Sequence, residues 1–281
     1  MFRSGDESNI LSVIYGEPYE LEGNGDTDDV SLKPFFCRIG SKFLLRNLIL
    51  PLIPPHTTYV EPFAGGGAIF FAKPKAEKTV LNDLDKETAA NFRLLQHAPT
   101  DLDAYPEATT VEGHKRIFNM TPKTNADKIA VSLVKNCDGF YGTPVLQAKA
   151  IVKTPSIHRK AKKIEEYKEK LNGVRITSED YAKVIKDNDG PNTFFFIDPP
   201  YEDTSKTFGY AEHEGFDFER LVTVLSHIKG KFLMTMNDSP SIQKLFSKFY
   251  QRRFKAKSNI SSSSKTGYTR YELFISNYKL P

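Results

Sequence analysis

Residues 58–67 read Thr-Tyr-Val-Glu-Pro-Phe-Ala-Gly-Gly-Gly, a short apolar run that leads into three glycines. Small residues at a sharp turn from a strand into a helix let a nucleotide-like ligand approach the backbone. Residues 68–72 are apolar and are predicted to form the helix after the turn. The stretch therefore predicts the first strand, loop and helix of a parallel α/β fold.

Strands and helices alternate along much of the remaining chain. Continuous apolar strands separated by helices are typical of a parallel sheet covered by helices on both faces, so we predict an α/β, Rossmann-like fold. The predicted strands are 79–82, 174–177, 193–197 and 231–236. The predicted helices are 86–96, 126–136, 156–171 and one that begins at Asp217 and ends near Gly230.

The alternation also suggests where the domains divide. Residues 1–30 hold eight acids and one base without a sustained period, which predicts a flexible acidic arm, with a strand at 10–15 as the alternative. Residues 31–98 and 174–281 carry the alternating pattern and are predicted to form the main domain. Residues 99–173 break the pattern and are predicted to be an inserted module.

The charge of the chain indicates a polyanionic partner. Without the arm, 38 of the 39 bases and 27 of the 35 acids remain, which is a net charge of +11. A body of that sign suits nucleic acid, although an ordinary basic surface explains it equally well. The longest apolar stretch, 43–53, contains Arg46, Asn47 and Pro51, so neither a membrane span nor a signal segment is expected.

The chain has two cysteines, Cys37 and Cys137, which lie 100 residues apart. Neither has the neighbouring ligands of a metal site, so no bound metal is expected. We predict free thiols in a reducing, intracellular compartment.

An acid follows the second predicted strand. Asp83 stands 18 residues after Gly65, at the tip of strand 79–82, where a carboxylate can accept hydrogen bonds from both hydroxyls of a ribose. Glu61, at the head of the glycine loop, suits the ammonium group of a methionine moiety better than a pyrophosphate, which it would repel. The alternatives are a plain tight turn for the glycines and a helix cap for Asp83.

The buried strand 193–197 ends in the turn Asp198-Pro199-Pro200-Tyr201. Prolines donate no hydrogen bond, so the turn offers acceptors, namely the Asp198 carboxylate and the Pro199 carbonyl. Two acceptors suit an adenine amino group, because they aim its lone pair at an electrophilic methyl. Tyr201 offers a face on which a flipped-out base can stack. The alternative is a β-turn with a solvent-facing Asp198 and a core Tyr201.

Taken in order, these motifs resemble the Dam-like, class alpha adenine-N6 DNA methyltransferases, in which the cofactor motif precedes the target-recognition region and then the D-P-P-Y turn. The resemblance runs from about Lys33 to Tyr278. It implies a Rossmann-like, S-adenosylmethionine-dependent methyltransferase sheet with a small target-recognition module at 99–173. It also implies methyl transfer to a flipped-out adenine in double-stranded DNA, with residues 198–201 as the catalytic turn.

The resemblance further implies a set of cofactor-binding residues. Residues 33–35 and 40–42 match the family's opening cofactor motif, although Cys37 and Arg38 stand where many relatives carry Lys and Trp. Phe63 is expected near the methionine moiety and Asp180 beside the adenine of the cofactor. The expected cofactor-binding residues are Gly40, Lys42, Glu61, Pro62, Phe63, Gly65, Asp83, Ile176 and Asp180.

Two segments are expected to contact DNA. Residues 239–271 contain eight bases and no acid, which predicts a loop that grips phosphates. Residues 136–142 resemble the start of the family's recognition hairpin, and the bases of 158–163 offer a second phosphate contact. The alternatives are a solvated basic face for 239–271, a core position for Phe140 and Tyr141, and a plain surface helix for 158–163. The expected DNA-binding residues are Asn136, Phe140, Tyr141, Arg252, Arg253, Lys257, Lys265 and Arg270.

Three other functions fit parts of the pattern. An RNA or ribosomal base methyltransferase would share the cofactor fold, and a cytosine-N4 methyltransferase more often carries Ser in place of Asp198. An inactive, cofactor-binding DNA-binding subunit is the third alternative, which the intact 198–201 turn opposes. The sequence leaves the DNA recognition sequence, any partner nuclease and the choice between monomer and dimer open.

Overall fold

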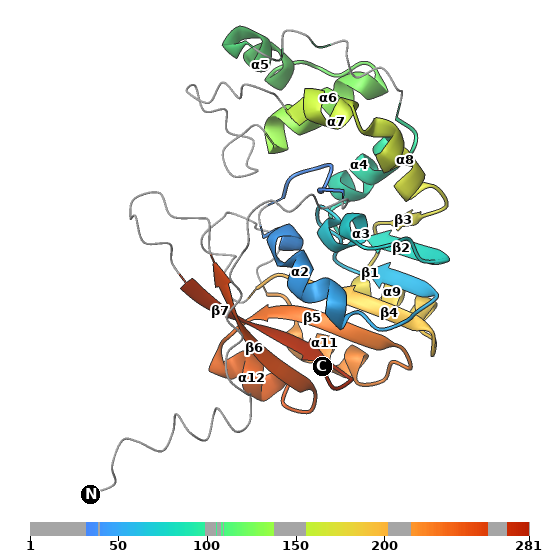
Figure 1. The fold of residues 1–281 in the computed structure, drawn as a ribbon, viewed down its shortest axis with the longest axis vertical. Helices are drawn as coiled ribbons and strands as arrows, with labels where there is room; N and C mark the ends of the chain where they lie inside the picture. Colours follow the sequence, from blue (N-terminus) through green and yellow to red (C-terminus); the bar gives the residue numbers. More distant parts are fainter. Residues whose placement is uncertain are drawn as a thin grey trace, which may run out of the picture. The chain divides into compact units, whose positions relative to one another are not determined.

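The structure is a computed structural model of the 281-residue chain, and it describes residues 32–38, 40–98, 105, 108, 110–137, 156–201, 215–257 and 269–280. Seven strands of this described part form a mixed sheet in the order β3-β2-β1-β4-β5-β7-β6 (Figure 1). The run β3-β2-β1-β4-β5 is the order of a doubly wound, Rossmann-like sheet, so the predicted α/β class is confirmed. The strands are β1 (Thr58–Glu61), β2 (Lys78–Asn82), β3 (Arg175–Thr177), β4 (Thr193–Ile197), β5 (Lys231–Asn237), β6 (Tyr250–Lys257) and β7 (Thr269–Ser276).

The helices of the described part agree closely with the predicted ones at 68–72 and 86–96. The α-helices are α2 (Arg46–Ile49), α3 (Ala68–Ala72), α4 (Lys86–Gln96), α5 (Val111–Phe118), α6 (Asn125–Asn136), α7 (Ser156–Ala161), α8 (Ile164–Leu171), α9 (Tyr181–Asn188), α11 (Phe218–Leu225) and α12 (Pro240–Leu245). Two short 3-10 helices, η1 (Lys42–Leu45) and η2 (Leu50–Leu52), flank α2.

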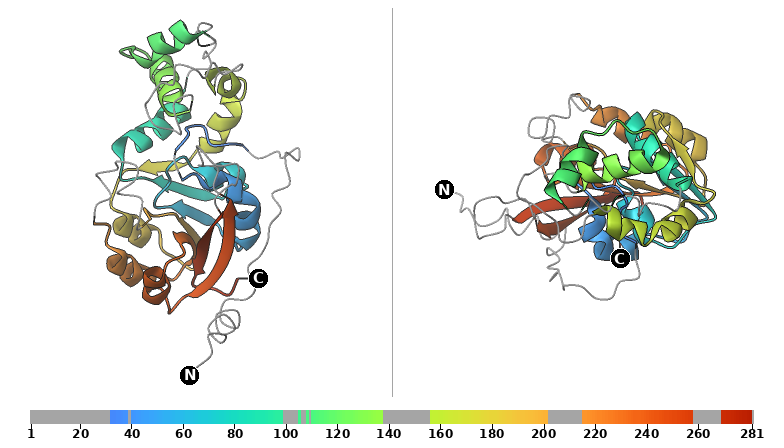
Figure 2. Two further views of the ribbon diagram at one scale, coloured as in Figure 1. Left: turned by 90° about the vertical axis from the view of Figure 1, so that its left-hand side faces the viewer. Right: turned by 90° about the horizontal axis from the view of Figure 1, so that it is seen from above.

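The chain forms two compact units. Of the described residues, the first unit holds 51–62 and 182–280, and the second holds 32–50 and 63–181. In the first unit, β1, β4 and β5 are parallel, and β7 runs antiparallel between β5 and β6. All five residues of β4 are buried, as the continuous apolar run predicts. Helices α9, α11 and α12, coloured gold to dark orange, lie along one side of these strands (Figure 2).

Gly230 stands before β5, where the sequence predicted the end of a helix. Helix α11 begins after Asp217, whose side chain caps it as predicted, but it ends at Leu225. A Cβ atom on Gly230 would lie 2.7 Å from the Thr193 carbonyl oxygen. The glycine therefore allows the chain to approach the start of β4 closely.

The second unit joins the parallel pair β2 and β3 to helices α3 to α8. The Gln96 side chain, at the end of α4, donates to the carbonyls of Leu171 and Val174 over 2.7 and 3.0 Å, which ties α4 to the end of α8. The predicted helix 156–171 is two helices, because Lys163 leaves helical geometry with φ of −119°.

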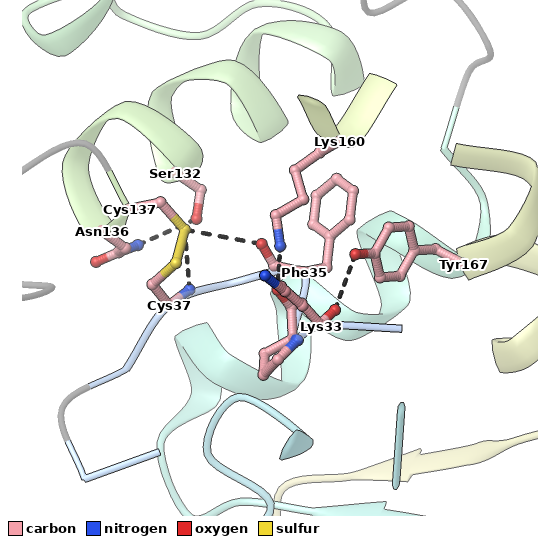
Figure 3. The surroundings of a disulfide bond; sticks show 9 residues. Lys33, Phe35, Cys37, Ser132, Asn136, Cys137, Lys160 and Tyr167 are labelled. Carbon is pink, nitrogen blue, oxygen red and sulfur yellow. Dashed lines mark hydrogen bonds between the residues drawn. A yellow bond between two sulfur atoms is a disulfide. The ribbon is translucent and has the colours of Figure 1, made fainter. Parts of the chain in front are cut away.

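The two cysteines form a disulfide in the second unit, so the prediction of free thiols is wrong. Their Cα atoms lie 5.0 Å apart, and the Cys37 amide donates to the Cys137 sulfur over 3.1 Å (Figure 3). The prediction failed because distance along the chain says nothing of distance in space: Cys137 is the C-cap of α6, and the segment 33–38 passes beside it. That segment is also held by the Tyr167 hydroxyl, which donates to the Lys33 carbonyl over 2.8 Å.

The disulfide is expected to stabilise the fold measurably. A cross-link that closes a loop of 100 residues restricts the unfolded chain, so Cys137→Ser should lower the free energy of unfolding by about 2–5 kcal/mol. Urea unfolding of the oxidised protein, of the protein reduced with dithiothreitol and of the variant measures this difference. The reduced protein should match the variant, and an oxidised protein no more stable than the reduced one would contradict the prediction.

Candidate functional site

The glycine loop of the second unit is shaped by close contacts with its surroundings. Gly65 and Gly67 have φ of +50° and +66°, which L side chains rarely adopt. The Ala64 amide donates to the Asn82 carbonyl over 2.8 Å, which joins the loop to the end of β2. A Cβ atom on Gly66 would lie 2.8 Å from the Phe36 carbonyl oxygen. The segment before η1 therefore packs directly on the loop.

Asp83 is fixed by backbone donors on both of its oxygens. Oδ2 accepts from the Gly65 amide over 2.8 Å and Oδ1 accepts from the Asp85 amide over 3.0 Å. Burial raises the pKa of Asp83, although the two amide hydrogen bonds oppose the rise. A carboxylate with two oxygens in defined directions can accept further hydrogen bonds from a diol.

Asp85, and not Asp83, caps helix α4, so the helix-cap alternative for Asp83 is wrong. The Asp85 side chain accepts from the Glu87 amide over 2.9 Å and forms an ion pair with Arg38 at 2.5 Å. Burial by itself would raise the pKa of Asp85, but the hydrogen bonds from Thr88, the Glu87 amide and Arg38 outweigh it and lower that pKa. Arg38 also donates to the Thr88 hydroxyl. Arg38 thus fastens the opening segment to the start of α4.

The other predicted cofactor residues of the second unit lie in several elements. Lys42 is buried and its Nζ donates to the Gly40 carbonyl over 2.9 Å. Ile176 lies in β3, opposite Leu81 in β2. The Phe63 and Tyr181 rings pack with their centroids 5.2 Å apart.

Asn82 holds the turn that carries Asp180, and sequence reasoning missed this role. Its Oδ1 accepts from the Thr177 hydroxyl over 2.8 Å and from the Glu179 amide over 2.9 Å. Its Nδ2 donates to the Glu179 carbonyl over 2.9 Å. A buried amide at the end of an apolar strand is the sequence signal that points to such a role, because a buried polar group needs partners.

In the first unit, Glu61 ends β1 and Asp198 follows β4. The two strands are parallel, with Val60 opposite Phe195, so their carboxyl ends meet at one edge of the sheet. Glu61 is 2% exposed and accepts from the Tyr59 hydroxyl over 2.6 Å. Burial, followed by the charge of Glu61, raises the pKa of Tyr59 well above its ordinary value, so the hydroxyl stays protonated as the donor.

The turn at 198–201 rests on two polar side chains from the sheet. The Thr235 hydroxyl in β5 donates to Asp198 Oδ1 over 2.7 Å, and the Tyr201 hydroxyl donates to Glu272 Oε2 in β7 over 3.0 Å. Burial, followed by the charges of Asp198 and Glu272, raises the pKa of Tyr201 well above its ordinary value. Asp198 is half-buried and held, which differs from the solvent-facing carboxylate of the β-turn alternative.

The predicted DNA-binding residues are spread over different elements. Residues 250–257 form strand β6 instead of the predicted loop, because they pair with β7. Arg253 is paired with Asp238 at 2.5 Å and its guanidinium lies 3.9 Å from the centre of the Tyr271 ring. Asn136 donates to the Ser132 hydroxyl over 3.2 Å. Phe140, Tyr141 and Lys265 lie outside the described residues, as do the side chains of Lys257 and Arg270.

Lys160 illustrates a base that is not available for a phosphate contact. It is 9% exposed, donates to the Pro34 carbonyl and lies 5.6 Å from the centres of the Phe35 and Tyr167 rings. The expected phosphate contact from 158–163 is therefore wrong for this residue. The sequence gives no sign that Lys160 turns inward, because Phe35 and Tyr167 lie outside its helix α7.

The strand order, the glycine loop and the acid after β2 are the features of a Rossmann-like fold. A family model described as D12 class N6 adenine-specific DNA methyltransferase matches residues 39–134 and 147–260. The chain belongs to this family. Among the described residues, no helix combines the length and the apolar character needed to cross a membrane.

Named relatives agree with the family. The chain is 29% identical to the type II methyltransferase M1.LlaDCHI of Lactococcus lactis subsp. cremoris, over 89% of this chain and 96% of the relative. It is 27% identical to the DNA N-6-adenine-methyltransferase of Escherichia phage P1, over 81% of this chain and 33% of that longer protein. It is 23% identical to the type II methyltransferase M.CviBI of Paramecium bursaria Chlorella virus NC1A, over 72% of this chain and 81% of the relative.

The close approach at Gly66 gives a testable prediction. Gly66→Ala should lower the free energy of unfolding by about 1–3 kcal/mol, because the new methyl group must displace the Phe36 carbonyl. Gly190→Ala is the matched control, since its Cβ would meet only the Thr193 hydroxyl at 3.6 Å. Chemical unfolding of both variants measures the difference. Equal stabilities would show that the glycine loop has room for a side chain.

Proposed function

We propose that this protein transfers a methyl group from S-adenosylmethionine to the exocyclic amino nitrogen of an adenine flipped out of double-stranded DNA. The observation that carries the proposal is the half-buried Asp198 carboxylate, fixed by Thr235 at the end of a fully buried parallel strand. Membership of the D12 class family supports the same reaction.

Each residue of the turn has its own role in the proposed methyl transfer. Asp198 and the carbonyl of Pro199 accept the two amino hydrogens of the adenine and point its lone pair at the reacting carbon. Pro199 and Pro200 keep the turn rigid. Tyr201 stacks on the flipped base, and this stacking stabilises the bound base by about 1–3 kcal/mol. The cofactor supplies an electrophilic methyl on a sulfonium. As the C–N bond forms and the C–S bond breaks, the amino group loses one proton to solvent and a thioether leaves.

The cofactor is proposed to bind the glycine loop and the ends of β2 and β3. Asp83 accepts from the ribose hydroxyls, because its two oxygens are already oriented by backbone amides. Glu61 faces the ammonium group, with Pro62 beside it, and Phe63 and Gly65 pack against the rest of the ligand. Gly40 and Lys42 contact the methionine end of the cofactor, and Ile176 and Asp180 contact its adenine end. The loop is open at Gly65, where a Cβ atom would meet nothing within 4 Å, which supports the approach of a ligand there.

DNA is proposed to contact the inserted module at 99–173 and the basic segment 239–271, with 31–98 and 174–281 as the catalytic domain. The proposed contacts are Asn136, Phe140, Tyr141, Arg252, Arg253, Lys257, Lys265 and Arg270. The alternation of β6 puts Arg252 and Arg253 on opposite faces of the strand, so we assign them contacts with different parts of the duplex. The names of two relatives as type II methyltransferases support a place in restriction-modification.

The reaction is tested directly by mapping the modification. The protein is incubated with S-adenosylmethionine and duplex DNA, and the methylated adenines are located by sequencing; RNA is the parallel substrate. Methyl groups on adenine N6 within one short DNA sequence are expected. Methylation of RNA alone, or of cytosine N4, would overturn the proposal.

The catalytic role of Asp198 predicts a loss confined to turnover. Asp198→Ala should lower kcat about 100- to 1000-fold, as expected when a preorganised polar partner of the reacting group is removed. Cofactor affinity should stay within about twofold of the wild type, because the cofactor contacts are assigned to other residues. Single-turnover kinetics and isothermal titration measure the two quantities. Retained turnover would contradict the role of Asp198.

The role of Asp83 predicts a dependence of cofactor binding on pH. A ribose diol donates to the ionised carboxylate, and burial raises the pKa of Asp83, so the acid takes up a proton at a higher pH than an ordinary aspartate. Cofactor affinity should therefore fall as the pH drops through that raised pKa. Asp83→Asn should bind about tenfold or more weakly and lose this pH dependence. Titration of both proteins across acidic pH is the measurement, and parallel curves would contradict the assignment.

A further inference from the structure

Two polar side chains are buried in the apolar strands next to the 198–201 turn. Thr235 in β5 is 0% exposed and Glu272 in β7 is 1% exposed, among neighbours such as Met234 and Leu273 that are fully buried. Burying a hydroxyl or a carboxylate costs free energy unless it forms hydrogen bonds. Apolar residues at these two positions would match the rest of the strands, so the polar ones need an explanation.

The two side chains share one face of the sheet. Strands β5 and β7 are antiparallel, with Thr235 opposite Phe274 and Asn237 opposite Glu272. Directly opposed residues, and residues two apart on one strand, point to the same face. Thr235 and Glu272, which we call the polar pair, therefore lie on one face of the sheet, with Asn237 directly opposite Glu272.

Both members of the pair are bonded to the turn that carries the proposed chemistry. Thr235 donates to Asp198 Oδ1 over 2.7 Å and also interacts with the Tyr201 phenol. Glu272 Oε2 accepts from the Tyr201 hydroxyl over 3.0 Å. The aspartate is thus oriented at its carboxylate, and the tyrosine is held at the far end of its ring.

We infer that Thr235 and Glu272 are positioning residues for the proposed methyl transfer, an inference that rests on the proposed function. Thr235 sets the direction in which the Asp198 carboxylate faces the adenine amino group. Glu272 sets the plane of the Tyr201 ring on which the base stacks. Neither is assigned a contact with the substrate, and each acts through residues of the turn. A displacement of about 1 Å in such a site costs on the order of 100-fold in rate, which is why this support matters.

The role of Thr235 is tested by removing its hydroxyl while keeping its shape. Thr235→Val should lower kcat about tenfold or more, with KM for DNA and cofactor within about twofold, because the effect falls on the reacting geometry and not on binding. Thr235→Ser keeps the hydroxyl and should restore most of kcat. Thermal unfolding of each variant confirms that it is folded.

A second buried threonine provides the matched control. Thr193, at the start of β4, donates to the Asn188 carbonyl over 2.8 Å, at the opposite end of the strand from the turn. Thr193→Val should lower stability by an amount similar to Thr235→Val and leave kcat unchanged. Equal losses of kcat in the two variants, or no rescue by Thr235→Ser, would reduce Thr235 to a structural residue and overturn the inference.

The role of Glu272 is tested through its partner. If Glu272 acts through the Tyr201 hydroxyl, Glu272→Gln should lower kcat less in a Tyr201→Phe background than in the wild type. Strictly additive effects would show that Glu272 does not act through Tyr201.

The wild-type assay separates the two levels of the proposal. An active wild type with unchanged kcat in Thr235→Val would overturn the positioning inference alone. A wild type that methylates no adenine in DNA would overturn the proposed function together with the inference.

Discussion

The hydrogen bond from the Thr235 hydroxyl to the Asp198 carboxylate is the constraint on which the proposed chemistry depends. The side chain of an aspartate that follows a strand is free to rotate. If its carboxylate pointed in the wrong direction, the lone pair of the adenine amino group would stay delocalised in the ring. The buried strand β4 sets the position of Asp198, and β5 sets its direction. In the proposed reaction, position and direction together would make Asp198 an acceptor that needs no rearrangement when the base arrives.

The buried polar pair also shows a conflict between stability and function. Apolar residues of similar volume are often at least as stabilising as buried charged ones, so Glu272 in β7 is hard to explain by stability alone. Positions that break the local apolar pattern are where functional sites are expected. Asn82 in the second unit follows the same rule, because its amide holds the turn before Asp180.

The sequence predicted those parts of the fold that depend on local pattern. Strand 193–197 and helix 86–96 were predicted with the observed bounds, because an unbroken apolar run and a capped helix are read from neighbouring residues. The turn after β4 and the acid after β2 were found for the same reason: each directly follows a strand.

The remaining features depend on contacts between distant segments. The Thr235–Asp198 and Tyr201–Glu272 pairs span 37 and 71 residues, and their partners are fixed only by the strand order. The disulfide spans 100 residues and depends on the path of the segment beside α6. The basic residues 250–257 have a charge pattern typical of a loop, and pairing with β7 makes them a strand. Charge composition is a weak guide where tertiary pairing decides.

A structure of the protein with duplex DNA and the thioether product of the cofactor would show whether Asp198 holds the target base. We expect a target adenine outside the helix, with its amino nitrogen about 3 Å from an Asp198 oxygen that still accepts from Thr235. An adenine left in the duplex, or an Asp198 carboxylate turned away from the amino group, would contradict it.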